Sequence, residues 1–136
     1  MKINEKFVID TNILIYSFDK SSQFFNFSKK IIDENKENVC IVHKTISEFV
    51  CVLSKIGKNN VIQNELPKII EELNILLPDY ESTNHFKNLV KKYKPKGNQA
   101  YDFEIVSVMM ANNIKKIATI NKNDFNKISE IELITQ

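Results

Sequence analysis

FVIDTNILI, residues 7–15, joins one apolar run to another through three polar residues. Its first three residues are continuously apolar and β-prone, which predicts a buried strand of a parallel sheet that is covered on both faces. Asp10 follows at the carboxyl end of that strand, where open α/β sheets bind their ligands. Asp10 is explained equally well as the cap of a helix beginning near Asn12, because both residue types satisfy free N–H groups at helix starts.

Three further acids occupy related positions along the chain. Glu48 lies near the start of a predicted helix that follows the apolar run 39–42. Asp102 lies in the first turn of another predicted helix, where the helix dipole favours a negative charge. Asp124 follows the predicted strand 117–120 in a polar turn, so we expect it to repeat the geometry of Asp10. Each acid alone is better explained by solvation, the dipole or the turn, but together the four are expected to meet at one edge of a doubly wound sheet.

Four carboxylates that meet at one edge repel one another and raise one another's pKa unless a cation neutralises them. Mg²⁺ and Mn²⁺ are hard ions that take carboxylate and water ligands, whereas Zn²⁺ prefers nitrogen and sulfur. The four acids therefore predict a Mg²⁺ or Mn²⁺ site.

The order and spacing of these blocks resemble the PIN domain in its small bacterial form, the VapC-like toxin nucleases. The resemblance rests on the blocks Asp10-Thr11-Asn12, Ser47-Glu48, Asp102 and Thr119-x-Asn121-x-x-Asp124-Phe125. It spans nearly the whole chain and implies an α/β fold with three α/β/α layers around a mainly parallel sheet of four to five strands. It also implies a single PIN domain over residues 1–136.

The resemblance assigns roles to the four acids residue by residue. Asp10 and Asp102 match the aspartates most consistently tied to Mg²⁺ in the family, and Glu48 matches its glutamate. Asp124 matches the fourth acid, so all four are expected to be both catalytic and metal-binding. Many relatives carry an acid where this chain has Asn121, so the fourth role belongs to Asp124 or is shared between the two.

Other polar residues are assigned supporting roles by the same resemblance. Thr11, Asn12 and Ser47 match positions that support the carboxylates or the scissile phosphate. Glu104 is a candidate auxiliary acid, although its spacing from Asp102 fits a solvent-facing residue better.

The activity implied by the resemblance is a Mg²⁺- or Mn²⁺-dependent ribonuclease, commonly an endonuclease that cuts tRNA, ribosomal RNA or mRNA. Metal ions held by carboxylates polarise a phosphodiester and lower the pKa of bound water, so no covalent nucleophile is needed. The expected setting is the toxin of a toxin–antitoxin pair with a cognate antitoxin, and a homodimer. The alternatives are a housekeeping RNA-processing nuclease and an interaction module with impaired catalysis. A dehalogenase-like phosphatase, with Asp10 as nucleophile, would need a second Asp where Asn12 stands.

Charge gives a weaker indication of partners. The net charge is only +2, and all 19 basic residues are Lys, so phosphate contacts must be made without the forked guanidinium of Arg. The candidate RNA-binding lysines are Lys92, Lys94, Lys96 and Lys122, and ordinary solvated faces explain them equally well.

Length and composition predict one domain. With 136 residues, 43% of them hydrophobic, the chain can bury about two-thirds of its unfolded surface. It has no long apolar stretch or secretory leader, so we expect a cytoplasmic protein with no membrane contact. Cys40 and Cys51 are expected to be reduced core residues, and His43 and His85 to lie at a helix start or on the surface.

The apolar pattern predicts an alternation of helices and strands. Helices are expected over residues 12–18, 23–35, 44–56, 61–73, 82–93 and 100–112. Strands are expected over residues 7–9, 39–42, 117–120 and 132–134, with a short additional one at 75–77. The helices at 44–56 and 61–73 carry more apolar residues than one side of a small sheet needs. The resemblance implies that they contribute to a groove for an antitoxin segment, and the alternative is that they complete the core.

Overall fold

The computed structural model describes all residues from 1 to 136 and contains one five-stranded sheet in which every strand is parallel. The strand order is β3-β2-β1-β4-β5, so β1 lies at the centre. The strands are β1 (Phe7–Ile9), β2 (Val39–Val42), β3 (Asn74–Leu76), β4 (Lys116–Ala118) and β5 (Glu132–Ile134). From β1 the chain builds outward through β2 to β3, and it then crosses to the other side of β1 to form β4 and β5. The predicted sheet is confirmed, with five strands.

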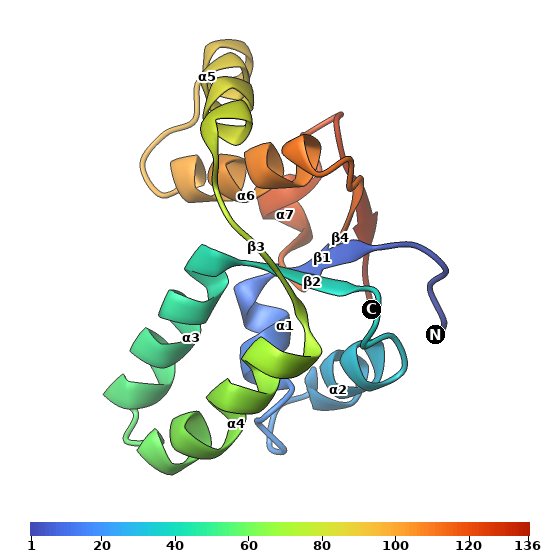
Figure 1. The fold of residues 1–136 in the computed structure, drawn as a ribbon, viewed down its shortest axis with the longest axis vertical. Coiled ribbons are helices and arrows are strands. Elements are labelled where there is room, and N and C mark those ends of the chain that lie inside the picture. The colour runs from blue at the N-terminus through green and yellow to red at the C-terminus, as the bar shows by residue number, and fades with distance from the viewer.

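Seven helices cover the two faces of the sheet, as Figure 1 shows. One group packs on the first face: α1 (Thr11–Tyr16), α2 (Phe25–Asp33), α3 (His43–Lys55) and α4 (Asn59–Glu72). The other group packs on the second face: α5 (Tyr80–Tyr93), α6 (Gln99–Ala111) and α7 (Lys122–Phe125). The predicted α/β/α layering is therefore confirmed.

The central strand explains why both faces need cover. Phe7 and Ile9 are fully buried against the first group of helices, and Val8 is fully buried against the second. Successive side chains of a strand point to opposite faces, so a strand without polar positions becomes stable only between two helical layers.

The expected elements differ from the observed ones mainly at the end of the chain. Strand β4 ends at Ala118 instead of Ile120, and residues 122–125 form the short helix α7 where a polar turn was expected. Asp124 therefore lies in a helix and does not repeat the strand-end geometry of Asp10. A four-residue helix is too short to show an apolar period, and it is anchored by the single buried side chain of Phe125.

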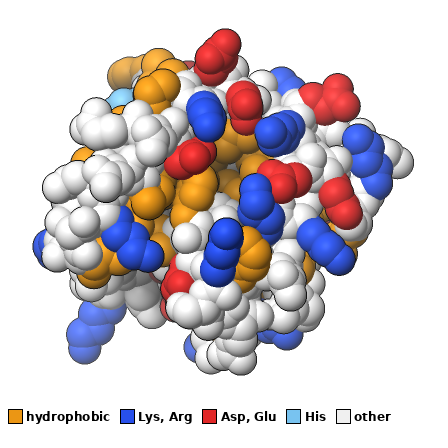
Figure 2. Space-filling model, turned by 90° about the horizontal axis from the view of Figure 1, so that it is seen from below, with side chains coloured by type: hydrophobic (Ala, Val, Ile, Leu, Met, Phe, Trp, Pro, Cys, Tyr) orange, Lys and Arg blue, Asp and Glu red, His pale blue; other side chains and the backbone are white.

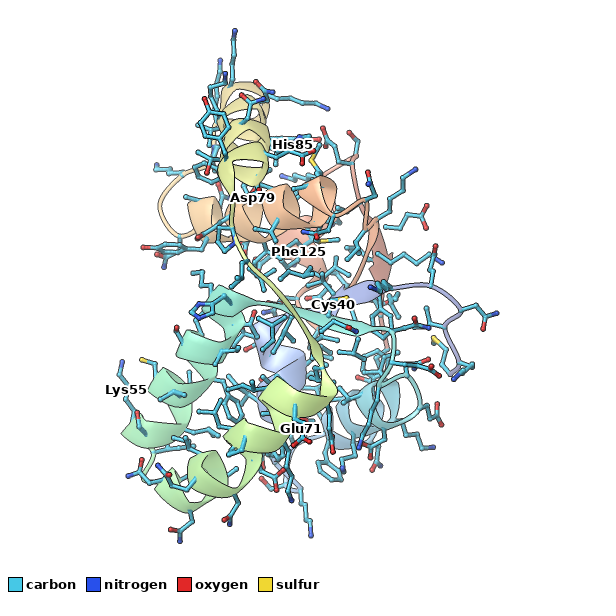
Figure 3. The ribbon with its side chains drawn as sticks, viewed as in Figure 1. Cys40, Lys55, Glu71, Asp79, His85 and Phe125 are labelled. Atoms are coloured by element: carbon cyan, nitrogen blue, oxygen red, sulfur yellow. The ribbon has the colours of Figure 1, made fainter.

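The cysteines and histidines have no shared site. Both cysteines are free, as predicted, and Cys40 lies buried in β2 (Figure 3). Cys51 is exposed on α3, so its assignment to the core was wrong. His43 is the exposed first residue of α3, and His85 lies 3.9 Å from Glu81 on α5. No helix is long and apolar enough to cross a membrane.

Candidate active site

The candidate site lies at the carboxyl ends of β1 and β4, where the chain's progression across the sheet reverses. Asp10 directly follows β1, and Thr119 directly follows β4. The Asp10 N–H donates to the Ala118 carbonyl at 3.0 Å, which fixes the two strand ends together. This reversal point is where open α/β sheets form their ligand crevice.

Asp10 is almost completely buried, with 8% of its surface exposed. Its carboxylate accepts a hydrogen bond from the Thr11 N–H at 2.8 Å and another from the Thr119 hydroxyl at 3.1 Å. Burial raises the pKa of Asp10, these two hydrogen bonds lower it, and the negative charges of Glu48 and Asp124 raise it. Asp10 is also the N-cap of α1, so the cap interpretation describes part of what this residue does.

Glu48 reaches the site from α3. Its Oε1 accepts a hydrogen bond from the Thr11 hydroxyl at 3.3 Å and lies 3.2 Å from the ammonium of Lys44. Thr45 lies fully buried beside them, with its hydroxyl 3.5 Å from that of Thr11. Thr11 and Lys44 thus hold the Glu48 carboxylate, which is itself partly exposed, and Thr45 contacts Thr11 behind it.

Asp102 carries the largest pKa shift of the four acids. It lies half-buried in the first turn of α6, and its pKa is raised to about 6. Burial is the main cause, followed by repulsion from Asp124, Asp10 and Glu48, whereas Lys44 lowers the pKa. The structure therefore brings all four acids within electrostatic reach, and we call them the acidic site.

The last block of the sequence contributes two exposed residues. Asp124 lies in α7, where its charge raises the pKa of both Asp10 and Asp102. Asn121 caps the start of α7, and its N–H donates to the Thr119 hydroxyl at 3.0 Å. Both line an open hollow over residues 120–124.

The remaining candidates are spread more widely. Asn12 is half-buried in α1 and Ser47 is exposed on α3. Glu104 lines a separate cavity of about 300 Å³ between α5 and α6, beside Phe86 and Ser107, and so lies apart from the acidic site.

The candidate RNA-binding lysines do not form one surface. Lys122 is exposed on α7, two residues from Asp124. Lys92 pairs with Glu130 at 2.9 Å, and Glu130 precedes β5 and so lies toward the amino ends of the parallel strands, away from the acids. Lys94 and Lys96 are exposed in the connection between α5 and α6.

Three residues at the site were not predicted from the sequence: Lys44, Thr45 and Thr119. The signal for Lys44 was its position four residues before Glu48, a spacing at which opposite charges meet on a helix. Thr119 stood inside the block that carried the resemblance but had been given no role. Thr45 gave no signal, because a buried threonine in a helix usually serves packing.

The donors at this site fit a hard divalent cation, although the side chains do not form a closed cage. No three His, Cys, Asp or Glu side chains are gathered tightly enough to enclose an ion. Mg²⁺ keeps several water ligands and typically takes only one or two carboxylates directly, so it needs no such cage. The acids offer only oxygen atoms as ligands, and one nearby lysine offsets only part of the negative charge that they carry when ionised.

A sequence model of the PIN domain matches residues 7–131, which include every residue of the acidic site. The chain belongs to the PIN domain family. A search of curated protein sequences gave no match.

Solved structures of PIN domain proteins share this fold at low sequence identity. VapBC2 from Rickettsia felis, bound to a DNA fragment from its promoter, is 21% identical with a TM-score of 0.74, over 96% of this chain and 98% of that one. A toxin–antitoxin complex from Klebsiella pneumoniae is 20% identical with a TM-score of 0.72, over 93% and 96%. VapC20 from Mycobacterium tuberculosis, a toxin that cleaves the sarcin–ricin loop, is 10% identical with a TM-score of 0.67, over 82% and 87%. The PIN family and these neighbours together support a nuclease.

Proposed function

We propose that this PIN domain protein is a Mg²⁺- or Mn²⁺-dependent endoribonuclease and the toxin of a toxin–antitoxin pair. The observation that carries the proposal is the acidic site: four carboxylates at the reversal point of the sheet, with the pKa of Asp102 raised to about 6. Burial and the neighbouring negative charges raise the pKa of Asp10 and Asp102, and such a cluster of acids favours a role in binding a cation.

The residues of the site would have different roles in binding the ion and orienting its ligands. Asp10 and Asp102 would hold the ion, and Glu48 and Asp124 would complete its surroundings directly or through water. The ion, when bound, would activate water and stabilise the charge that develops on the phosphodiester. The Thr119 and Thr11 hydroxyls hold the Asp10 and Glu48 carboxylates, which keeps those oxygens in place as ligands. At a pH above about 6 the Asp102 carboxyl loses its proton and would then be available as a ligand.

The RNA target is proposed to be structured RNA. VapC20, which shares the fold, cleaves the sarcin–ricin loop, and this supports ribosomal RNA among the candidate classes tRNA, ribosomal RNA and mRNA.

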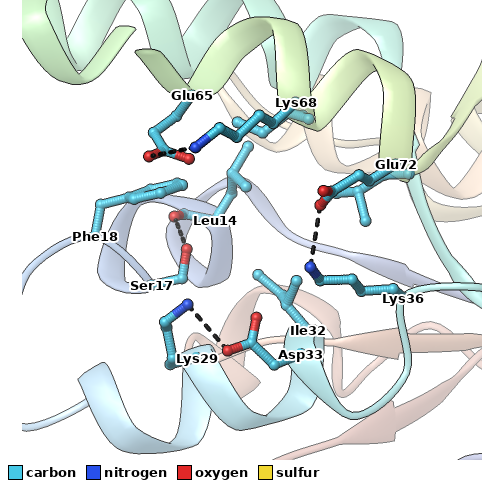
Figure 4. A pocket seen from close by; sticks show the side chains of 12 residues that line it. Leu14, Ser17, Phe18, Lys29, Ile32, Asp33, Lys36, Glu65, Lys68 and Glu72 are labelled. Atoms are coloured by element: carbon cyan, nitrogen blue, oxygen red, sulfur yellow. Dashed lines mark hydrogen bonds and ion pairs between the residues drawn. The ribbon is translucent and has the colours of Figure 1, made fainter.

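The antitoxin is proposed to bind a groove between α1, α2 and α4, which we call the charged-rim groove. It holds about 330 Å³, and Figure 4 shows it from close by. Its lining residues are Leu14, Ser17, Phe18, Lys29, Ile32, Asp33, Lys36, Glu65, Lys68, Ile69, Glu72 and Leu73. In Figure 2 apolar side chains occupy the centre of this face, and lysines and acids surround them. Helix-in-groove recognition uses such an apolar floor, and the charged rim suits a partner of mixed charge.

Some apolar residues of α3 and α4 lie outside this groove. Phe49 and Leu53 complete the core, as one of the two alternatives predicted. Val52, Ile56 and Ile70 are 38%, 59% and 50% exposed. Helix α4 lines the groove and α3 does not. The exposed apolar residues of α3 are available for the proposed homodimer contact.

The test of the activity is incubation of the purified chain with total cellular RNA, with and without Mg²⁺ or Mn²⁺. We expect cleavage only with the ion, at discrete positions, leaving 5′-phosphate ends. Asp10→Asn is the matched variant, because it keeps the side-chain volume and removes the charge. Cleavage that persists with chelator, or that is equal in Asp10→Asn, would show that a contaminant or another site is responsible.

The partner is tested separately. A short reading frame beside the gene would encode the candidate antitoxin, and its product should co-purify with the chain and stop cleavage. A Lys68→Glu variant, which reverses a charge at an exposed position of the groove rim, should weaken partner binding and keep cleavage. Cleavage without such a partner would favour a housekeeping RNA-processing nuclease, and partner binding without cleavage would favour an interaction module.

A further inference from the structure

Lys44 and Tyr101 meet across the rim of the acidic site although they belong to different helices. Lys44 lies in the first turn of α3, and Tyr101 lies in the first turn of α6. The Lys44 ammonium stands over the Tyr101 ring, 4.0 Å from its centroid. The same ammonium pairs with Glu48, and Tyr101 directly precedes Asp102 in the chain. The cation is therefore paired with one of the four acids, and the aromatic ring belongs to the residue next to another.

The two side chains differ in exposure. The Lys44 side chain is 23% exposed, because it lies between the ring and Glu48. Tyr101 is 53% exposed. Tyr80 is the only other aromatic residue among the exposed large hydrophobic side chains. A ring that is half in water and that stands beside a cation at the edge of the acidic site is open to contact with a ligand.

The chemistry of the pair fits an unpaired nucleotide. Nucleobases stack on exposed aromatic rings whatever their sequence, and lysines contact the adjoining phosphates as point charges. In double-stranded RNA the bases are stacked on one another and cannot reach a protein ring. A ring and a cation in contact can take the base and the phosphate of one nucleotide.

From this contact we infer that Tyr101 and Lys44 form a nucleotide subsite at the edge of the acidic site. Tyr101 stacks with the base of an unpaired nucleotide next to the bond that is cut, and Lys44 contacts its phosphate. This inference rests on the proposed ribonuclease function, and it adds the two residues that hold the nucleotide beside the bond that is cut. Lys44 also keeps a positive charge where the acids would otherwise repel the RNA backbone.

The test uses a short oligoribonucleotide without base pairing and the same strand annealed to its complement. Binding is measured by fluorescence anisotropy in an Asp10→Asn background, and KM and kcat are measured with Mg²⁺ or Mn²⁺ in the unaltered background. The variants are Tyr101→Ala, Tyr101→Phe and Lys44→Met. The matched controls are Tyr80→Ala, which removes another exposed tyrosine, and Lys55→Met, which removes a lysine from the far end of the same helix (Figure 3).

We expect Tyr101→Ala to raise both Kd and KM for the unpaired strand by roughly tenfold, the usual effect of losing one stacked base. Tyr101→Phe keeps the ring and should leave both values unchanged. Lys44→Met should lower the slope of log Kd against log salt by about 0.7, the value for one phosphate contact on a single strand. The controls should match the unaltered chain, and the duplex should bind equally to all ring variants.

The outcomes separate this inference from the proposed function. Metal-dependent cleavage by the unaltered chain, with the same KM in Tyr101→Ala and the same salt slope in Lys44→Met, would overturn the nucleotide subsite and leave the nuclease standing. An effect as large in Tyr101→Phe as in Tyr101→Ala would overturn stacking. No cleavage by the unaltered chain would overturn both proposals.

Discussion

The acidic site and the charged-rim groove both contain charged side chains, but their charges are balanced in different ways. In the groove each acid has a lysine partner: Lys29 with Asp33 at 2.9 Å, Lys36 with Glu72 at 3.1 Å and Lys68 with Glu65 at 3.8 Å. In the acidic site four carboxylates share one lysine. Each acid of the groove is thus paired with a lysine, whereas Lys44 alone cannot balance the charge of the four carboxylates.

The difference shows that the number of charged side chains at a site does not by itself indicate what the site does. The groove pairs lie at the surface, where an ion pair contributes about 0–1 kcal/mol and serves solubility and partner choice. At the acidic site burial and repulsion act together on the carboxyls of Asp10 and Asp102, which is the arrangement expected of a proposed ion-binding site. Four predictions test this comparison, and they follow in order of expected effect.

The largest expected effect is stabilisation by a divalent ion. Mg²⁺ or Mn²⁺ at about a hundred times its Kd should add about 2.7 kcal/mol to the free energy of unfolding, because the ion binds the folded chain only. Thermal unfolding with increasing ion concentration measures this. Asp10→Asn and Asp102→Asn should abolish the shift, and Glu72→Gln in the groove should keep it. Equal shifts in all variants would mean that the ion binds elsewhere.

The second prediction concerns Thr119, whose hydroxyl donates to Asp10 at 3.1 Å. Thr119→Val keeps the shape of the side chain and removes the donor, so the Asp10 carboxylate loses one of the groups that orient it. We expect the affinity for the ion to fall about 10- to 100-fold, as for other residues that support a metal ligand. Calorimetric titration checks this, with Thr119→Ser as the conservative variant that should retain most of the affinity.

The third prediction is a pH dependence without added ion. The pKa of Asp102 is about 6 in the folded chain against its ordinary value of 3.8, so between these pH values the folded state binds more protons than the unfolded state. This contribution to stability is complete at low pH and is lost as the pH rises through about 6. Asp102→Asn should remove that part of the slope when unfolding by urea is followed across this range.

The affinity for the ion over the same pH range provides an independent test. Ion affinity should rise where metal-free stability falls, because deprotonated Asp102 is the better ligand. An ion affinity that does not change between pH 5 and pH 7 would remove Asp102 from the metal ligands.

The smallest effect is expected in the groove. Lys36→Met should change the free energy of unfolding by less than about 1 kcal/mol, because the pair with Glu72 is half-exposed and screened by solvent. Cleavage and ion affinity should not change. A loss of cleavage in this variant would mean that the groove and the acidic site are coupled and do not act separately.

Much of the fold followed from short sequence patterns. The apolar triplet at residues 7–9 predicted a buried strand of a parallel sheet, because only full cover on both faces makes such a run stable. The long helices α3, α5 and α6 were located to within two residues by their apolar spacing. Helix α7 was missed because one turn is too short to carry a period, and Asp124 was misplaced for the same reason.

The site was predictable in its acids and not in their supports. Carboxylates after strands or at helix starts can be found in a sequence, since those positions share one edge of the sheet. Whether Thr119 donates to Asp10 depends on the pairing of β1 with β4, which the sequence does not encode locally. The contact of Lys44 with Tyr101 depends likewise on how two distant helices pack.

The hydrogen bond between Thr119 and Asp10 joins residues 109 positions apart, and this separation bears on synthesis. Proteins are made from the amino terminus, so β1, β2 and β3 can pair while the segment containing β4 is still inside the ribosome. Asp10 then lacks both the Thr119 hydroxyl and the neighbouring strand, and Asp102 has only just been joined to the chain. In a chain of this topology the Asp10 carboxylate gains its Thr119 partner only after the segment that contains β4 has left the ribosome.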